Sequence, residues 1–315
     1  MTFAILFPGQ GSQSVGMLSA LAEVEPLVEQ TFREASDALA VDLWRLVREG
    51  PEEELGQTAN TQPAMLAAGV AVWRIWREHD GPVPMVMAGH SLGEYTALVC
   101  AGALDFPEAV ALVADRGRFM QEAVAPEAGA MAAIIGLEDE RLEAICREVS
   151  QGQVVSCANY NAPGQVVIAG QRQAVERAIQ AAKSAGARRA VVLPVSVPSH
   201  CALMEPAAEE LEQRLLQVSL RSPTVCPVLH NVDASEADGP DTIRQKLVAQ
   251  LHQPVRWTDC VRAIAQRGAQ RAFEFGPGKV LTGLCRRIDR SLDAVAVQDP
   301  ASLEQALLLS REAGQ

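Results

Sequence analysis

Residues 89–93, Gly-His-Ser-Leu-Gly, constrain the fold of this chain more than any other segment, because apolar runs flank them on both sides. Residues 85–88 predict a buried strand, and residues 92–100 predict a helix. A G-x-S-x-G sequence at a strand-to-helix turn is the pattern of a nucleophile elbow, which holds a serine hydroxyl clear of the backbone. The alternative is an ordinary glycine-rich turn between a strand and a helix.

The composition indicates a folded chain with a large core. It has 315 residues, of which 48% are hydrophobic, enough for a core and more than one lobe. The net charge of −12 argues against a general nucleic-acid binder, since such a protein needs a basic face. We therefore expect no nucleic-acid partner.

Cysteine usage and the N-terminal residues predict a cytoplasmic location. The seven cysteines are scattered, odd in number and without a C-x-x-C pair, which favours reduced thiols over disulfides or a zinc site. The first seven residues lack a basic region, and their apolar run is too short for a signal peptide. No stretch reaches the roughly 18 apolar residues that span a bilayer, so we expect no membrane partner.

The order of predicted elements indicates an α/β fold with two lobes. Strands alternate with helices, which predicts a mostly parallel sheet covered on both faces. The expected strands are 3–7, 85–88, 226–229 and 271–275, and the expected helices are 24–39, 64–78, 92–100, 107–122, 242–251, 258–267 and 278–288.

A middle segment has its own pattern. Its order is strand, helix, two strands, helix, strand, which is the ferredoxin-like βαββαβ arrangement. The expected elements are 130–136, 139–149, 154–158, 165–169, 174–185 and 189–195. We predict a small lobe over 128–196 inserted into a larger catalytic lobe made of 1–127 and 197–315.

A nucleophilic Ser91 needs a base, because a free serine hydroxyl is a poor nucleophile at neutral pH. Among the five histidines, His200 lies in a loop that two prolines stiffen, which suits a base reaching across a cleft. His230 is a second candidate, and a purely structural loop histidine is the third possibility. No acidic residue clearly follows to orient the base. Asp233, Glu205, a backbone carbonyl or an amide could do so.

Two further segments suggest binding groups. Residues 8–13, Pro-Gly-Gln-Gly-Ser-Gln, follow the first strand but lack the G-K-[ST] ending of a phosphate loop. We expect them to form half of an oxyanion hole, with the N–H of Gln10 joining the N–H of Leu92. Arg116 lies in an otherwise apolar helix and could hold a carboxylate in a bidentate pair; the alternative is a surface arginine.

Taken together, these motifs closely resemble the malonyl-CoA:acyl carrier protein transacylases of bacterial fatty acid synthesis. The resemblance runs from about residue 3 to residue 300 and includes 8–13, 89–95, 165–170, 197–200, 231–233 and 274–279. It implies an α/β-hydrolase-like large lobe with a parallel sheet and an inserted ferredoxin-like lobe. One departure is His230, where the family leads us to expect a polar residue such as Asn.

The resemblance also assigns roles to residues of this chain. It implies Ser91 as the nucleophile that accepts the acyl group and His200 as the base, oriented by the main-chain carbonyl of Gln250. It implies Arg116 as the partner of the malonyl carboxylate. The N–H groups of Gln10 and Leu92 would stabilise the oxyanion.

The expected activity is transfer of a malonyl group from malonyl-CoA to the phosphopantetheine thiol of acyl carrier protein, through a malonyl-serine intermediate. It needs no cofactor and no metal, and we expect a monomer. The alternatives are a serine hydrolase or thioesterase acting on acyl thioesters, and a non-catalytic acyl-binding module.

Because carrier proteins are acidic, docking on this acidic chain requires a local basic patch. Two clusters are candidates, though either could be an ordinary solvated face: Lys279, Arg286, Arg287 and Arg290 near the C-terminus, and Lys183, Arg188 and Arg189 on the small lobe.

Overall fold

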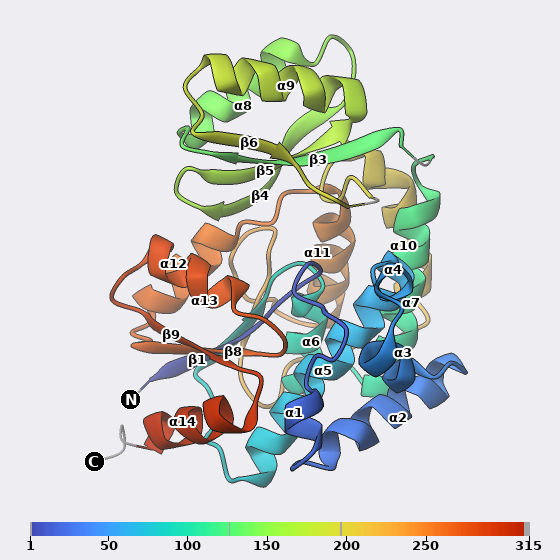
Figure 1. Ribbon diagram of the computed structural model, residues 1–315, viewed down its shortest axis with the longest axis vertical. Coiled ribbons are helices and arrows are strands. Elements are labelled where there is room, and N and C mark those ends of the chain that lie inside the picture. Colours follow the sequence, from blue (N-terminus) through green and yellow to red (C-terminus); the bar gives the residue numbers. More distant parts are fainter. Residues whose placement is uncertain (1, 126, 196, 312–315) are drawn as a thin grey trace.

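The computed structural model describes residues 2–125, 127–195 and 197–311. Residues 126 and 196, at the edges of the predicted insert, and the terminal residues lie outside this description. Figure 1 shows a larger lobe below and a smaller one above, each built around its own sheet. One sheet is parallel and the other antiparallel, which confirms the α/β class with two lobes.

The larger lobe is built on a five-stranded sheet. Its strands are β1 (Phe3–Phe7), β2 (Val86–Gly89), β7 (Val228–Leu229), β8 (Arg271–Phe275) and β9 (Asp293–Val297). They lie in the order β7-β2-β1-β8-β9, and every neighbouring pair is parallel. All five residues of β1 are buried, because helices cover both faces of the sheet.

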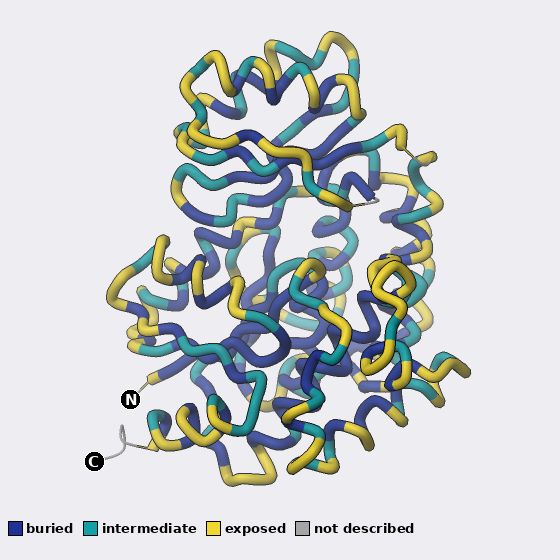
Figure 2. The backbone as a smooth tube through the Cα atoms, in the orientation of Figure 1, coloured by how far each residue is buried: buried dark blue, intermediate teal, exposed yellow. Residues whose placement is uncertain are grey.

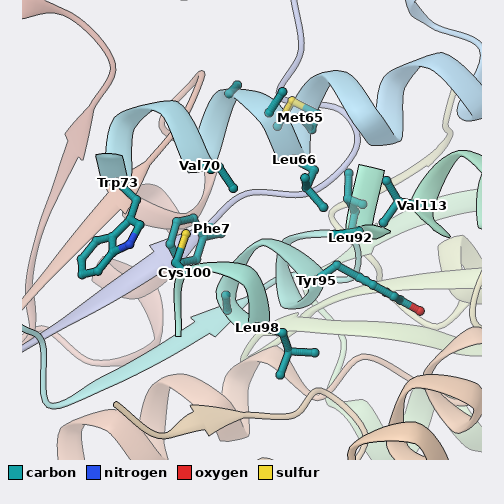
Figure 3. Packing of buried hydrophobic residues seen from close by; sticks show 14 of the residues in the cluster. Phe7, Met65, Leu66, Val70, Trp73, Leu92, Tyr95, Leu98, Cys100 and Val113 are labelled. Carbon is teal, nitrogen blue, oxygen red and sulfur yellow. The ribbon is translucent and has the colours of Figure 1, made fainter. Parts of the chain in front are cut away.

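Alternate side chains of β1 enter two different cores. Phe3, Ile5 and Phe7 pack on the face covered by α5 (Thr58–Glu78), α6 (Gly93–Cys100) and α7 (Phe106–Glu122). The smaller Ala4 and Leu6 pack on the opposite face, under α12 (Trp257–Gln266) and α13 (Val280–Ile288). Figure 3 shows α5 side chains closing over Phe7 and the apolar residues of α6. This packing anchors the turn between β2 and α6.

The remaining elements of this lobe are mostly short or peripheral. They are α1 (Ser19–Ala22), α2 (Leu27–Leu39), α3 (Leu43–Glu49), α4 (Glu52–Leu55), a 3-10 turn at Ala202–Met204, α10 (Glu205–Leu215), α11 (Pro240–His252) and α14 (Pro300–Arg311). The sequence patterns did not predict α1, α3, α4, α10, α14 or β9. They predicted the ends of α2, α6, α7, α11, α12 and α13 to within three residues, whereas α5 begins six residues before its predicted start.

The smaller lobe has the βαββαβ order that the sequence predicted. Its elements are β3 (Gly129–Ile135), α8 (Asp139–Val149), β4 (Val155–Ala162), β5 (Gln165–Gln171), α9 (Arg172–Ser184) and β6 (Arg189–Val192). The strand order is β4-β5-β3-β6, with every neighbouring pair antiparallel. Three strands differ in length from the prediction: β4 ends four residues later, β5 ends two residues later, and β6 ends three residues earlier.

The two faces of the small sheet have different neighbours. Helices α8 and α9 cover the outer face, at the top of Figure 1. The inner face packs Met131, Val167 and Ala169 against Cys201 of the larger lobe. Figure 2 shows the buried residues concentrated inside each lobe and where the lobes meet. The carboxyl ends of β1 and β2 point toward this junction, which is where ligands bind in parallel α/β sheets.

Candidate active site

The turn after β2 places Ser91 in a strained backbone conformation. Its φ is +52°, in the left-handed region that a residue with a Cβ rarely adopts. A Cβ on Gly89 would lie 1.8 Å from the carbonyl carbon of Gly93, and a Cβ on Gly93 would lie 2.1 Å from the carbonyl oxygen of Phe7. The two glycines therefore let β2, the turn and α6 pack closely enough to present the serine.

The structure brings Ser91 and His200 together. Ser91 Oγ lies 2.8 Å from His200 Nε2, and His200 Nδ1 lies 2.7 Å from the main-chain oxygen of Gln250 in α11. Because a carbonyl only accepts, Nδ1 carries the proton and donates it, which leaves the Nε2 lone pair facing the serine hydroxyl. The backbone carbonyl thus takes the orienting place that an acidic residue holds in many serine enzymes.

The surroundings of His200 keep it neutral. Burial lowers the pKa of His200 to about 3, and the positive charge of Arg116 acts in the same direction. The hydrogen bond to the Gln250 carbonyl opposes this by raising the pKa. At neutral pH the imidazole is therefore unprotonated and able to accept a proton.

The other candidate base and the acidic orienters have different partners. His230 is buried, and its Nδ1 lies 2.7 Å from Glu94 Oε1; among the described residues it has no hydrogen bond to Ser91. Asp233 pairs instead with Lys246 Nζ at 2.9 Å. Glu205 begins helix α10. None of these residues takes the place that His200 and its orienting carbonyl occupy.

Arg116 of α7 is buried beside the serine, so the alternative of a surface arginine is wrong. Its side chain is 1% exposed. Nη1 donates to Gln62 Oε1 at 2.8 Å, and Nη2 donates to Gln250 Oε1 at 3.0 Å and to Ser91 Oγ at 3.3 Å. The neighbouring Arg118 is the surface residue, pairing with carboxylates of its own helix.

The charge of Arg116 has no carboxylate within ion-pair distance among the described residues. Burial lowers the pKa of this guanidinium, but arginine stays charged in proteins. Its guanidinium carbon also lies 5.3 Å from the centre of the Tyr95 ring, a cation–π contact. A buried cation held by amide oxygens and a hydroxyl is ready to bind an anionic group.

A cavity of about 240 Å³ opens onto these residues from the junction of the two lobes. Ser91, His200, Arg116, Gln10 and Leu92 all line it. Among the described residues, no hydrogen bond uses the backbone N–H of Gln10 or Leu92, so both donors remain available.

The rest of the cavity wall comes from both lobes and is mostly apolar. The small lobe and the loop after it contribute Met131, Val167, Leu193, Val195 and Val197, and α13 contributes Val280, Leu281 and Leu284. Polar groups on the wall include His90, whose Nε2 lies 2.8 Å from Asn161 Oδ1. His90 thus bonds to the small lobe and not to Ser91 beside it.

Three buried residues around the site were not predicted from the sequence. Gln62 of α5 holds Arg116, while Asn231 and Glu94 form a hydrogen-bonded network beneath Ser91. A signal for Glu94 was present, since it is the one charged residue in the apolar run 92–100. Among the described residues, no group of three or more His, Cys, Asp or Glu is placed to hold a metal ion.

Comparisons with known proteins agree with this geometry. The model of the acyl transferase domain family matches residues 4–302. The malonyl CoA-acyl carrier protein transacylase of Escherichia coli O157:H7 is 56% identical over 98% of this chain and 99% of its own length. The protein of that name from Bacillus subtilis strain 168 is 44% identical over 98% of this chain and 97% of its own.

Solved structures show the same similarity. An acyl carrier protein S-malonyltransferase from Vibrio cholerae superposes with a TM-score of 0.95 at 56% identity, covering 97% of this chain and 99% of that one. A malonyl-transacylase solved in complex with its type II PKS acyl-carrier protein superposes with a TM-score of 0.97 at 56% identity, covering 98% and 100%.

Proposed function

The chain belongs to the acyl transferase domain family, and we infer from this membership and from its site that it is a malonyl-CoA:acyl carrier protein transacylase. It moves a malonyl group from malonyl-CoA to the phosphopantetheine thiol of acyl carrier protein. The observation that carries the choice of substrate is the buried Arg116, which lies 3.3 Å from Ser91 Oγ without a carboxylate partner.

The first half-reaction is acylation of Ser91. His200 Nε2 takes the hydroxyl proton as Ser91 Oγ attacks the thioester carbonyl of malonyl-CoA. The N–H groups of Gln10 and Leu92 donate to the oxyanion that forms; losing one such donor typically costs about 2.7–4 kcal/mol of barrier. The tetrahedral intermediate then collapses, the C–S bond breaks, and the CoA sulfur takes the proton from His200.

Arg116 selects the acyl group and holds it. Its guanidinium rests on the neutral amide oxygens of Gln62 and Gln250. A malonyl carboxylate is a charged and bidentate acceptor, so exchanging one or both amide oxygens for it is favourable in a buried site. The carboxylate also places a negative charge directly against this buried cation.

The second half-reaction returns the enzyme to its starting state. His200 removes the proton of the phosphopantetheine thiol, and the sulfur attacks the ester carbonyl of malonyl-Ser91. Ser91 Oγ leaves and recovers a proton from the imidazolium. The atoms and protons balance across the two steps without a cofactor.

A serine hydrolase would use the same elbow but would let water attack the ester. The mostly apolar wall of the cavity disfavours an ordered attacking water, and family membership favours transfer. The two activities separate in one assay. Incubation with malonyl-CoA alone should leave malonyl on Ser91 without releasing free malonate, and added carrier should discharge it as malonyl-carrier.

Trapping the intermediate tests the proposed function directly. Radiolabelled malonyl-CoA should label the wild-type chain and leave Ser91→Ala unlabelled. Label that persists in the variant would refute Ser91 as the acceptor. Rapid release of free malonate without carrier would favour the hydrolase.

We also propose that the small lobe has the limits 128–196 and that the protein works in the cytoplasm. No helix among the described residues is long and apolar enough to cross a membrane. Fractionation of cells that express the chain would test the location. Limited proteolysis near the two ends of the insert would test its limits.

A further inference from the structure

Glu94 is a fully buried carboxylate beneath the nucleophile, in the first turn of α6. Oε1 lies 2.7 Å from His230 Nδ1. Oε2 accepts from the backbone N–H of Asn231 at 2.8 Å and from Gln250 Nε2 at 2.8 Å. Because burying a carboxylate is costly unless its oxygens are hydrogen-bonded, this set of nitrogen partners makes Glu94 the centre of a network.

Through Gln250 this network reaches each group of the site. The Gln250 side chain, held by Glu94, also donates to the main-chain oxygen of Ser91 at 3.0 Å. Its Oε1 accepts from Arg116 at 3.0 Å, and its main-chain oxygen accepts from His200 Nδ1 at 2.7 Å. Fixing the side chain of this one residue therefore helps to fix the nucleophile, the base and the carboxylate-binding cation relative to one another.

A second branch passes through Asn231. Its backbone is held by Glu94, while its side-chain Oδ1 accepts from the backbone N–H of Ser91 at 2.7 Å. Its Nδ2 donates to the main-chain oxygen of Gly89 at 2.8 Å. Asn231 thus holds both sides of the strained turn by hydrogen bonds, and Glu94 holds the backbone of Asn231 in the same way.

We propose that Glu94 is a positioning residue for acyl transfer, acting on Ser91 and His200 through Gln250 and Asn231. The inference rests on the proposed function, because it assigns a role within that reaction. The acid of a serine triad bonds the histidine directly; here the acid lies one residue further away, behind the glutamine whose carbonyl orients the base. Its negative charge also faces the buried Arg116 and raises the pKa of that guanidinium.

The test is Glu94→Gln, which keeps the size of the side chain and removes its charge. Single-turnover labelling of the full chain with radiolabelled malonyl-CoA gives both the rate of acylation and the fraction of protein labelled. We expect the full fraction at a rate lower by about 10- to 100-fold, since small misplacements of reacting groups have effects of that order. The KM for malonyl-CoA should stay within about twofold. Acylation by acetyl-CoA should slow by the same factor, because both acyl groups use the same base.

Glu274→Gln is the matched control. Glu274 is also buried, at 1% exposed, and its oxygens accept from the backbone N–H groups of Leu281 and Thr282 and from the Thr282 hydroxyl. Among the described residues it has no hydrogen bond to Ser91 or to its network. We expect this variant to lose thermal stability and to keep the acylation rate within about twofold.

Two outcomes with Glu94→Gln would overturn the inference. One is a wild-type acylation rate with the full fraction of protein labelled. The other is a wild-type acylation rate with a smaller labelled fraction, which would mean that Glu94 stabilises the fold but does not position the reacting groups. If Glu94→Gln does not fold, Glu94→Asp keeps the charge and draws it back by about 1 Å; slower labelling of the full fraction supports the proposal and a wild-type rate overturns it. A wild-type chain that never labels on Ser91 would instead refute the proposed function.

Discussion

Burial keeps His200 unprotonated near neutral pH, which its proposed role as the base requires. A solvent-exposed histidine has a pKa near 6.5 and would be partly protonated near pH 7. Burial and the charge of Arg116 lower the pKa of His200 to about 3. The cost is a weaker base, which the short hydrogen bond to the Gln250 carbonyl partly offsets by favouring the imidazolium.

This shift predicts the pH dependence of acylation. Above its folded-state pKa, His200 is neutral, so the rate of Ser91 labelling by malonyl-CoA should not fall with an apparent pKa near 6.5. The acid limb of the pH–rate profile, where the rate falls as His200 becomes protonated, should lie below about pH 5. Stopped-flow labelling between about pH 5 and pH 8 would show this, and a limb centred near pH 6.5 would contradict it. In Arg116→Met the limb should move to higher pH, because a charge that lowers the His200 pKa is gone.

The same shift has a sign for stability. The unfolded chain binds a proton on His200 below about pH 6.5, whereas the folded chain does so only near pH 3. Between these values the unfolded state binds more protons, so the free energy of unfolding falls as the pH falls. One group contributes about 1.4 kcal/mol per pH unit within that window. Urea unfolding of wild type and His200→Gln should show a shallower dependence in the variant.

At the scale of elements, the site depends on how closely β1, β2 and α6 pack. A Cβ at residue 93 would overlap the main-chain oxygen of Phe7, and neither strand nor helix can move away without opening the core. We therefore expect Gly93→Ala to destabilise the fold by about 4 kcal/mol or more, in the range of severe core disruptions. Urea denaturation measures it.

A matched control is Gly283→Ala in α13, where an added Cβ meets nothing within 4 Å. It should stabilise or leave the fold unchanged, since alanine is the better helix former. If Gly93→Ala lowers the free energy of unfolding by less than about 1 kcal/mol, the turn accommodates an added Cβ, and the close packing of Gly93 against Phe7 does not limit stability.

Elements with a continuous or regular apolar pattern were predictable, and elements with few buried residues were not. The buried strand β1 and the helix α7 show their patterns directly in the sequence. The edge strand β9 has only five residues, two of them buried, so its apolar signal is weak. Helix α10 was predictable from its apolar spacing at Ala207, Leu211 and Leu215, which the sequence analysis did not use.

The candidate site was partly predictable for a different reason. The glycines around the serine predict a tight turn between a strand and a helix, and the two prolines predict a stiff loop at His200. The contacts of Gln250, Gln62 and Asn231 come from segments far apart in the chain. Amide side chains carry no charge or period that would reveal such contacts, so only the folded structure brings them to Ser91.

At the scale of the whole molecule, the cavity lies between the two lobes, and each lobe carries one of the two basic clusters. Lys279 directly precedes Val280, a residue of the cavity wall, and Arg189 begins the strand β6 that leads to Leu193 on the same wall. All seven cations of the two clusters are exposed. We propose that an acidic carrier bound at the cavity mouth contacts both clusters.

Charge reversal tests this arrangement. Two double variants each reverse two charges of one cluster: Lys279→Glu with Arg286→Glu, and Lys183→Glu with Arg188→Glu. We expect each double variant to raise the KM for the carrier several-fold at low salt, and by less at high salt because salt screens the charges. Ser91 labelling by malonyl-CoA in the absence of carrier should reach the same final fraction. Carrier KM values that stay unchanged in both variants would place the docking surface elsewhere.

In the proposed reaction, the buried Arg116 beside Ser91 selects an acyl group that carries a carboxylate. The most direct measurement compares malonyl-CoA and acetyl-CoA as donors for the wild type and Arg116→Ala, by kcat/KM for transfer to the carrier. We expect malonyl transfer to fall by about 100-fold or more, from the loss of a buried charge-assisted pair, while acetyl transfer is kept or rises. An equal loss for both donors would contradict the claim.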